Sequence, residues 1–149
     1  MKKLLFTFLT FLAIACSQEN YNKEAAISVT IKKDELQNFN PIGNPIIVTL
    51  KNNSNKISPI WVMNCDYNQN FITDNKEIGF PAIDCDKNIP KLYNLKPLEE
   101  KKIKLYLIYN IGSVKTKFKI GFLMNKESTF DKKNQKEKIK IIWSNQLSI

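Results

Sequence analysis

Apolar side chains recur at every second position in several short stretches of this chain, and this period constrains the fold more than any other feature. Three stretches show it best, with these residues on the apolar side: Ile27, Val29 and Ile31; Ile103, Leu105 and Leu107; Phe118, Ile120, Phe122 and Met124. Successive side chains of a β-strand point to opposite faces of a sheet, so the pattern predicts strands with one buried face. Apolar positions three or four apart are rare over any long window, and asparagine is scattered throughout. We therefore expect an all-β chain.

The predicted strands are short and are separated by clusters of Asn, Gly and Pro. We expect strands at about 26–32, 46–50, 60–63, 102–109, 118–124 and 138–144, with shorter ones near 71–73 and 91–95. The segments NFNPIGNP, KNNSNK and NIGS that lie between them are typical of turns. About seven short strands joined in this way predict a single antiparallel β-sandwich.

Two segments resemble the immunoglobulin-like modules of bacterial envelope proteins. They are NPIIVTLKNNSN and the later LKPLEEKKIKLYL. In such modules a strand that ends in an Asn-rich turn is followed by a Leu-x-Pro turn and an amphipathic strand. The resemblance implies an immunoglobulin-like β-sandwich, which we assign to residues 26–149.

The N-terminus has the composition of an export signal. Lys2 and Lys3 precede the almost wholly apolar residues 4–15, a run too short to span a bilayer, which needs about 20 apolar residues. Cys16 follows directly, and residues 13–16 resemble the lipobox of bacterial lipoproteins, although the family usually has Leu where this chain has Ala13. An ordinary signal peptide with a cysteine beside its cleavage site is the alternative.

The lipoprotein resemblance implies that Cys16 receives a diacylglyceryl thioether, with palmitate-type chains, and becomes the first residue of the mature protein. Residues 1–15 are then a signal peptide and residues 16–25 a polar tether. Each buried CH₂ contributes about 0.8 kcal/mol, so two or three acyl chains anchor a protein firmly to a membrane. Ser17 is not the aspartate that the family associates with inner-membrane retention, which favours the outer membrane.

The charge of the mature chain comes from lysine alone. Without residues 1–15 the chain has 21 lysines, no arginine and 14 acidic residues, a net charge of +7. Proteins that bind nucleic acids usually contact phosphates and bases through arginine and carry a recognised motif. We therefore expect a solvated lysine surface and no nucleic-acid partner.

Cys65 and Cys85 remain after the lipid anchor is set aside. In an exported protein an even number of cysteines indicates a disulfide, and closing a loop of about 20 residues stabilises a fold by roughly 3 kcal/mol. The alternative is a zinc site made from Cys65, Asp66, Asp84, Cys85 and Asp86. Histidine is absent from the chain, and neither cysteine has a second one two to four residues away.

The absence of histidine also excludes Ser-His-Asp and Cys-His catalysis and any histidine general base. Glu99 and Glu100 are adjacent, so in a strand they point to opposite faces and cannot share a substrate. The chain has only four glycines and no glycine-rich phosphate loop. We expect neither enzymatic activity nor a cofactor.

Aromatic residues are the remaining candidates for a binding site. Tyr67, Phe71 and Phe80 lie in a long irregular segment, where aromatic side chains give a large contact area to a partner. The alternative is that these rings fill one end of the core. Trp61 and Trp143 lie within predicted strands and are expected in the core.

These features predict a lipid-anchored cell-envelope protein that acts as a binding or scaffolding module. Its expected partners are the membrane, through the lipid on Cys16, and an envelope protein or ligand that the sequence does not identify. Two alternatives stay open. One is an envelope protease inhibitor, whose aromatic loop would enter a cleft, and the other is a metal-handling lipoprotein.

Overall fold

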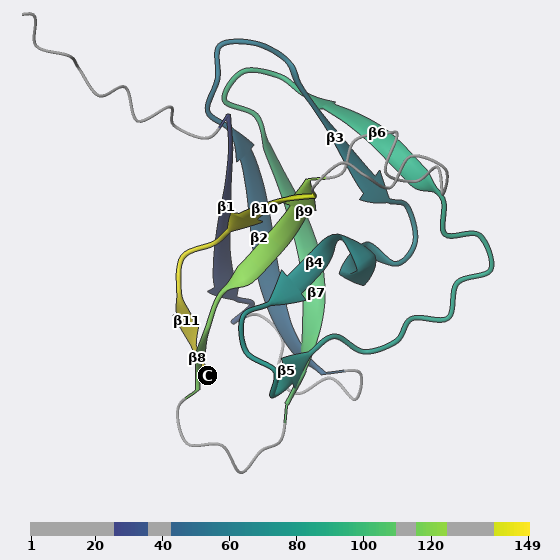
Figure 1. The fold of residues 1–149 in the computed structure, drawn as a ribbon, viewed down its shortest axis with the longest axis vertical. Helices are drawn as coiled ribbons and strands as arrows, with labels where there is room; N and C mark the ends of the chain where they lie inside the picture. Colours follow the sequence, from purple (N-terminus) through teal and green to yellow (C-terminus); the bar gives the residue numbers. More distant parts are fainter. Residues whose placement is uncertain (1–25, 36–42, 110–115, 125–138) are drawn as a thin grey trace, which may run out of the picture.

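The computed structural model describes residues 26–35, 43–109, 116–124 and 139–149 (Figure 1). The elements are β1 (Ile27–Lys33), β2 (Asn44–Asn52), β3 (Ser58–Met63), the 3-10 helix η1 (Tyr67–Asn70), β4 (Phe71–Thr73), β5 (Ile78–Gly79), β6 (Pro90–Leu95), β7 (Glu100–Tyr109), β8 (Lys117–Phe118), β9 (Ile120–Met124), β10 (Lys140–Trp143) and β11 (Leu147–Ser148). Every strand pair is antiparallel, which confirms the prediction of an all-β chain. None of the described ranges contains a helix of the length and apolarity needed to cross a membrane.

The strands form several small sheets. A four-stranded sheet has the order β1-β2-β7-β5, and a three-stranded sheet has the order β10-β9-β4. Two further pairs, β11-β8 and β3-β6, stand apart from these sheets, and Figure 1 shows β3 and β6 together at one end of the molecule. The predicted stretch 118–124 is divided at Lys119 into β8 and β9, and β5 was not predicted, so the strands are more numerous than expected. β2 and β3 are longer than the predicted stretches 46–50 and 60–63.

The predicted alternation decides which side chains enter the core. Ile103, Leu105 and Leu107 are buried on β7, and Phe118 and Ile120 are buried where β8 passes into β9. These residues belong to one buried cluster with apolar residues of β1, β2, β3 and β4. The four-stranded and three-stranded sheets therefore share a single core.

A buried asparagine joins β2 to the β3-β6 pair. Asn52 is fully buried, and its Nδ2 donates hydrogen bonds to the carbonyl oxygens of Lys56 at 2.7 Å and of Leu95 and Lys96 at 3.0 Å each. Its Oδ1 accepts a hydrogen bond from the hydroxyl of Ser58 at 3.1 Å. A buried amide is costly unless it is hydrogen-bonded, and here both of its ends are satisfied.

A second asparagine joins the edge of the four-stranded sheet to the chain after β10. The backbone N–H of Ile31 donates to Asn145 Oδ1 at 2.8 Å, and Asn145 Nδ2 donates to the Ile31 carbonyl at 3.1 Å. This pair of bonds reproduces the exchange between two facing residues of antiparallel strands. The Asn145 side chain thus takes the place of a neighbouring strand beside β1.

The expectation that both tryptophans lie in the core is wrong for Trp143, whose side chain is 42% exposed. Ile142 points into the core from β10, so its neighbours on the strand point outward. Trp61 is partly buried on β3, between the buried Ile60 and Val62. Alternation at every second position separates the two faces of a strand. It does not show which face points into the core when one carries tryptophan and the other isoleucine.

Candidate functional site

A disulfide joins Cys65 to Cys85, as the sequence predicts, with a Cα–Cα distance of 6.3 Å. It closes part of the irregular segment between β3 and β6. The bridge uses both sulfur atoms that the alternative zinc site requires as thiolates. Across the described ranges, no three His, Cys, Asp or Glu side chains are grouped as metal ligands would be.

Side chains on both sides of the disulfide hold this segment in place. Asn88 Oδ1 accepts hydrogen bonds from the backbone N–H groups of Cys65 at 3.4 Å and Asp66 at 3.0 Å. The carboxylate of Asp66 accepts from the Asn68 N–H and from Gln69 Nε2, both at 3.1 Å, and so caps η1. The segment is ordered by its own polar side chains as well as by the covalent bridge.

The three aromatic residues predicted for a partner-binding loop lie in or against the core. Phe71 is 4% exposed, and its ring centroid is 5.5 Å from that of Phe122 on the neighbouring strand. Tyr67 and Phe80 are partly buried and pack against the same core. The alternative of packing at one end of the core describes this placement, and the envelope protease inhibitor with an aromatic loop stays a prediction. Partner binding through Tyr67 or Phe80 stays a prediction.

Tyr67 belongs to a polar cluster between η1, β6 and β7. Burial raises the pKa of Tyr67, and a hydrogen bond with Tyr93 adds to this effect, whereas Lys101 and Lys91 act in the opposite direction. The ammonium of Lys101 lies 3.7 Å from the centroid of the Tyr93 ring, and that of Lys91 lies 5.5 Å from it. Both distances are within the range of cation–π attraction, so the two lysines stabilise the observed position of the Tyr93 ring.

The outward side of the three-stranded sheet is apolar. Ile141 and Trp143 on β10 are 40% and 42% exposed, and the strand register places Ile141 beside Leu123 and Trp143 beside Gly121. Ile72 on β4 lies on the other side of Gly121. We call Ile72, Leu123, Ile141 and Trp143 the apolar face.

The outward side of the four-stranded sheet is mainly polar by contrast, with Ile47 and Ile108 as apolar exceptions. One row across it consists of Thr30, Thr49 and Lys102. Lys51 and Glu100 are also paired across it, with Nζ and Oε1 3.3 Å apart. A sheet with one side exposed to solvent normally carries polar residues on that side. The apolar face of the three-stranded sheet departs from this pattern.

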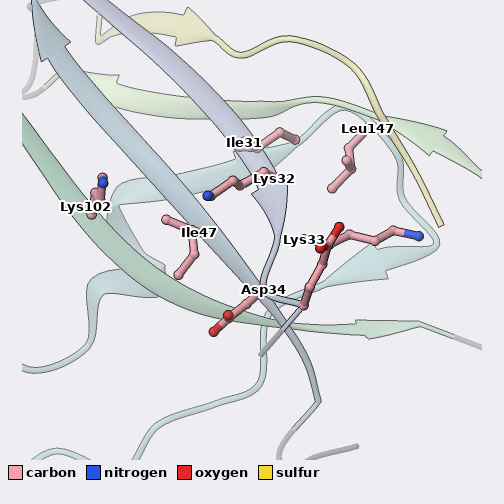
Figure 2. A pocket seen from close by; sticks show the side chains of 8 residues that line it. Ile31, Lys32, Lys33, Asp34, Ile47, Lys102 and Leu147 are labelled. Atoms are coloured by element: carbon pink, nitrogen blue, oxygen red, sulfur yellow. The ribbon is translucent and has the colours of Figure 1, made fainter. Parts of the chain in front are cut away.

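A cavity of about 750 Å³ lies beside the end of β1 (Figure 2). Lys32, Lys33 and Lys102 line it together with Asp34 and Glu35, and its aliphatic lining is contributed by Ile31, Ile47 and Leu147. Asp34 is held by an ion pair of 2.8 Å to Lys104, the residue opposite Ile47 on β7. The sequence predicts these lysines to be part of a solvated surface, and no motif marks the cavity.

Comparisons of the chain with protein-family models, with curated proteins and with solved structures found no match. The apolar face is suited to a macromolecular partner, and the cavity beside β1 is suited to a small ligand.

Proposed function

We propose that this protein is a lipid-anchored binding module of the bacterial cell envelope, held in the outer membrane through Cys16 and acting by binding and not by catalysis. The apolar face is the observation that carries this function. Residues 1–15, Cys16 and the rest of the tether 16–25 lie outside the described residues, so the anchor rests on the sequence resemblance to lipoproteins.

We also propose that the described strands form an immunoglobulin-like sandwich. The sheet orders β1-β2-β7-β5 and β10-β9-β4 correspond to the orders A-B-E-D and G-F-C of constant-type immunoglobulin domains. The shared core supports this assignment, because residues of both sheets belong to one buried cluster. The Cys65–Cys85 bridge lies outside both sheets and is unlike the inter-sheet bridge of antibodies.

The apolar face supports binding because several apolar side chains lie together on the outward side of one sheet. Its two most exposed members, Ile141 and Trp143, come from an edge strand whose inward residue is already buried. Tryptophan is enriched among residues that contribute most to the binding energy of protein interfaces. An envelope protein that covers Trp143 is the partner we propose.

Photocrosslinking in intact cells tests this role of the apolar face. A photoreactive amino acid in place of Ile141 should form a discrete adduct with an envelope protein, and one in place of Thr30, on the polar sheet face, should not. Equal adducts at both positions, or no adduct at Ile141, would contradict the proposal.

The lipid anchor is tested by mass spectrometry of the protein extracted from membranes. We expect a mature N-terminus at Cys16 that carries the mass of its acyl groups. An unmodified Cys16, or a chain that retains residues 1–15, would contradict the anchor but would leave the role of the apolar face to the crosslinking experiment.

A further inference from the structure

We propose that the cavity beside the end of β1 binds an amphipathic anion, in which a phosphate or carboxylate group is attached to an aliphatic chain. This inference goes beyond the binding role proposed above, because the cavity lies at the four-stranded sheet and the apolar face lies on the three-stranded one. Three observations carry it: the balance of charges in the lining, the register of the lysines and the aliphatic side chains between them.

The lining has an excess of positive charge. Lys32, Lys33 and Lys102 form no ion pair with any described residue, whereas Asp34 is held 2.8 Å from Lys104 outside the lining. This ion pair leaves Glu35 as the other carboxylate that faces the cavity. Unlike charges attract more strongly beside low-dielectric walls than in open water, so this balance favours an anion.

The strand register brings two of the lysines to one side of the sheet. Lys32 lies opposite Ile47, and Lys102 lies opposite Thr49, which is two residues further along β2. Two strand spacings and two residue rises separate their Cα atoms by roughly 12 Å. Figure 2 shows the Lys32 side chain extending over the sheet toward Ile47 and Lys102, so one anionic group between them is within reach of both flexible side chains.

The aliphatic side chains of the lining are the reason for proposing a hydrocarbon chain on the ligand. Ile47 lies beside Lys32 on one side of β1, and Leu147 lies on the other side of the same strand in Figure 2. Ile47 and Leu147 are only partly buried by the protein itself. An inorganic anion would contact only the lysines, whereas a hydrocarbon chain would also remove Ile47, on the same side of β1 as Lys32, from water. The volume of the cavity is in the range of small-ligand sites.

The test is a calorimetric titration of the full chain, held in nanodiscs of phosphatidylcholine, with empty nanodiscs as the blank. The probes are octyl phosphate, inorganic phosphate and octanol. We expect saturable binding of one octyl phosphate and affinities for inorganic phosphate and octanol at least tenfold weaker, since each of these provides only one half of the ligand. Absence of saturable octyl phosphate binding would overturn the proposal.

Charge-matched variants show whether the cavity is the site. The double substitution Lys32→Gln with Lys102→Gln should weaken octyl phosphate binding at least tenfold. The control, Lys56→Gln with Lys117→Gln, removes the same charge from exposed lysines that do not line the cavity and should change affinity less than twofold. Equal loss in both variants would assign the binding to net charge and overturn the site. All four lysines are exposed, and unchanged thermal unfolding would confirm that each variant is folded.

The same titration distinguishes a membrane lipid from a free amphiphile as the source of the anion. In nanodiscs that contain phosphatidylglycerol, a site filled by lipid headgroups should show octyl phosphate binding reduced at least tenfold. Undiminished binding in those nanodiscs would identify the ligand as a free alkyl phosphate or carboxylate. Either result supports the cavity as an anion site and specifies its ligand.

Discussion

The side chain of Ile141 lies directly over Gly121, so that a Cβ atom added at Gly121 would be 2.6 Å from Ile141 Cγ2. The same Cβ would lie 3.0 Å from the Trp143 ring and 3.1 Å from Ile72. Gly121 therefore allows Ile72, Ile141 and Trp143 to rest against the sheet.

Gly121→Ala should push Ile141 and Trp143 outward and destabilise the fold by about 1–3 kcal/mol, the usual cost of overpacking. Urea unfolding followed by tryptophan fluorescence measures this change. Gly79→Ala is the matched control, because its Cβ would have its nearest contact at 3.6 Å. Equal effects at the two glycines would contradict the close approach described here.

Asn52→Ala should lower the free energy of unfolding by about 2–4 kcal/mol. The substitution leaves the carbonyl of Leu95 and the hydroxyl of Ser58 without their buried partner, and unmade buried hydrogen bonds are costly. Chemical denaturation provides the measurement. Asn53→Ala is the control, since among the described residues the side chain of Asn53 has no hydrogen-bond partner, and its backbone N–H donates to the Ala26 carbonyl. A loss at Asn53 as large as that at Asn52 would refute the role of the Asn52 amide.

Replacing Cys65 and Cys85 together by serine should destabilise the protein by about 3 kcal/mol. In the chain-entropy model the bridge removes freedom from the unfolded chain, and the cysteines are 20 residues apart. Reduction of the unmodified protein should lower the free energy of unfolding, measured by urea denaturation, by a similar amount. Thiol titration of the unreduced protein should detect neither cysteine, and a reactive thiol at either position would contradict the bridge.

Asn145→Ala should release the backbone of Ile31 and destabilise the fold by about 1–3 kcal/mol, because a β-strand amide and carbonyl lose their partner. Hydrogen exchange gives a local measurement, in which the Ile31 amide should exchange faster than in the unmodified protein. Gln146→Ala should leave the protection of Ile31 unchanged. Unaltered exchange at Ile31 in the Asn145 variant would rule out this contact in solution.

Stability should fall at alkaline pH in a way that depends on Tyr67. Burial raises its pKa in the folded protein above the value of about 10 expected when unfolded, so the folded state holds the proton more tightly. This contribution is present below the unfolded pKa and is lost as the pH rises through the folded pKa. Tyr67→Phe should flatten the decline, as measured by denaturation at several pH values, and an unchanged decline in this variant would contradict the role of Tyr67.

Much of the fold could be predicted from the alternation of apolar and polar residues. It placed Ile103, Leu105 and Leu107 in the core correctly, because strand geometry alone assigns alternate residues to one face. The short strand β5 was not predicted, since it depends on pairing with β7 at residues distant in sequence. The same limit explains Trp143, whose exposure depends on which strand neighbour faces the core.

The candidate sites were harder to predict than the strands. The pairing of Cys65 with Cys85 followed from counting cysteines in an exported chain. The cavity beside β1 brings Lys32 together with Lys102 and Leu147, which are far apart in sequence and carry no motif. Only the strand register places them side by side, and single-sequence patterns do not contain it.

The position of Asn145 has a consequence for how copies of this protein behave when they are crowded together. A bare outermost strand offers its main chain as a template, on which a strand from another molecule can extend the sheet into a fibre. The amide of Asn145 already occupies the main chain of Ile31, near the middle of β1. An incoming strand would find this backbone amide and carbonyl already hydrogen-bonded. The Asn145 side chain therefore disfavours extension of the four-stranded sheet at its β1 edge.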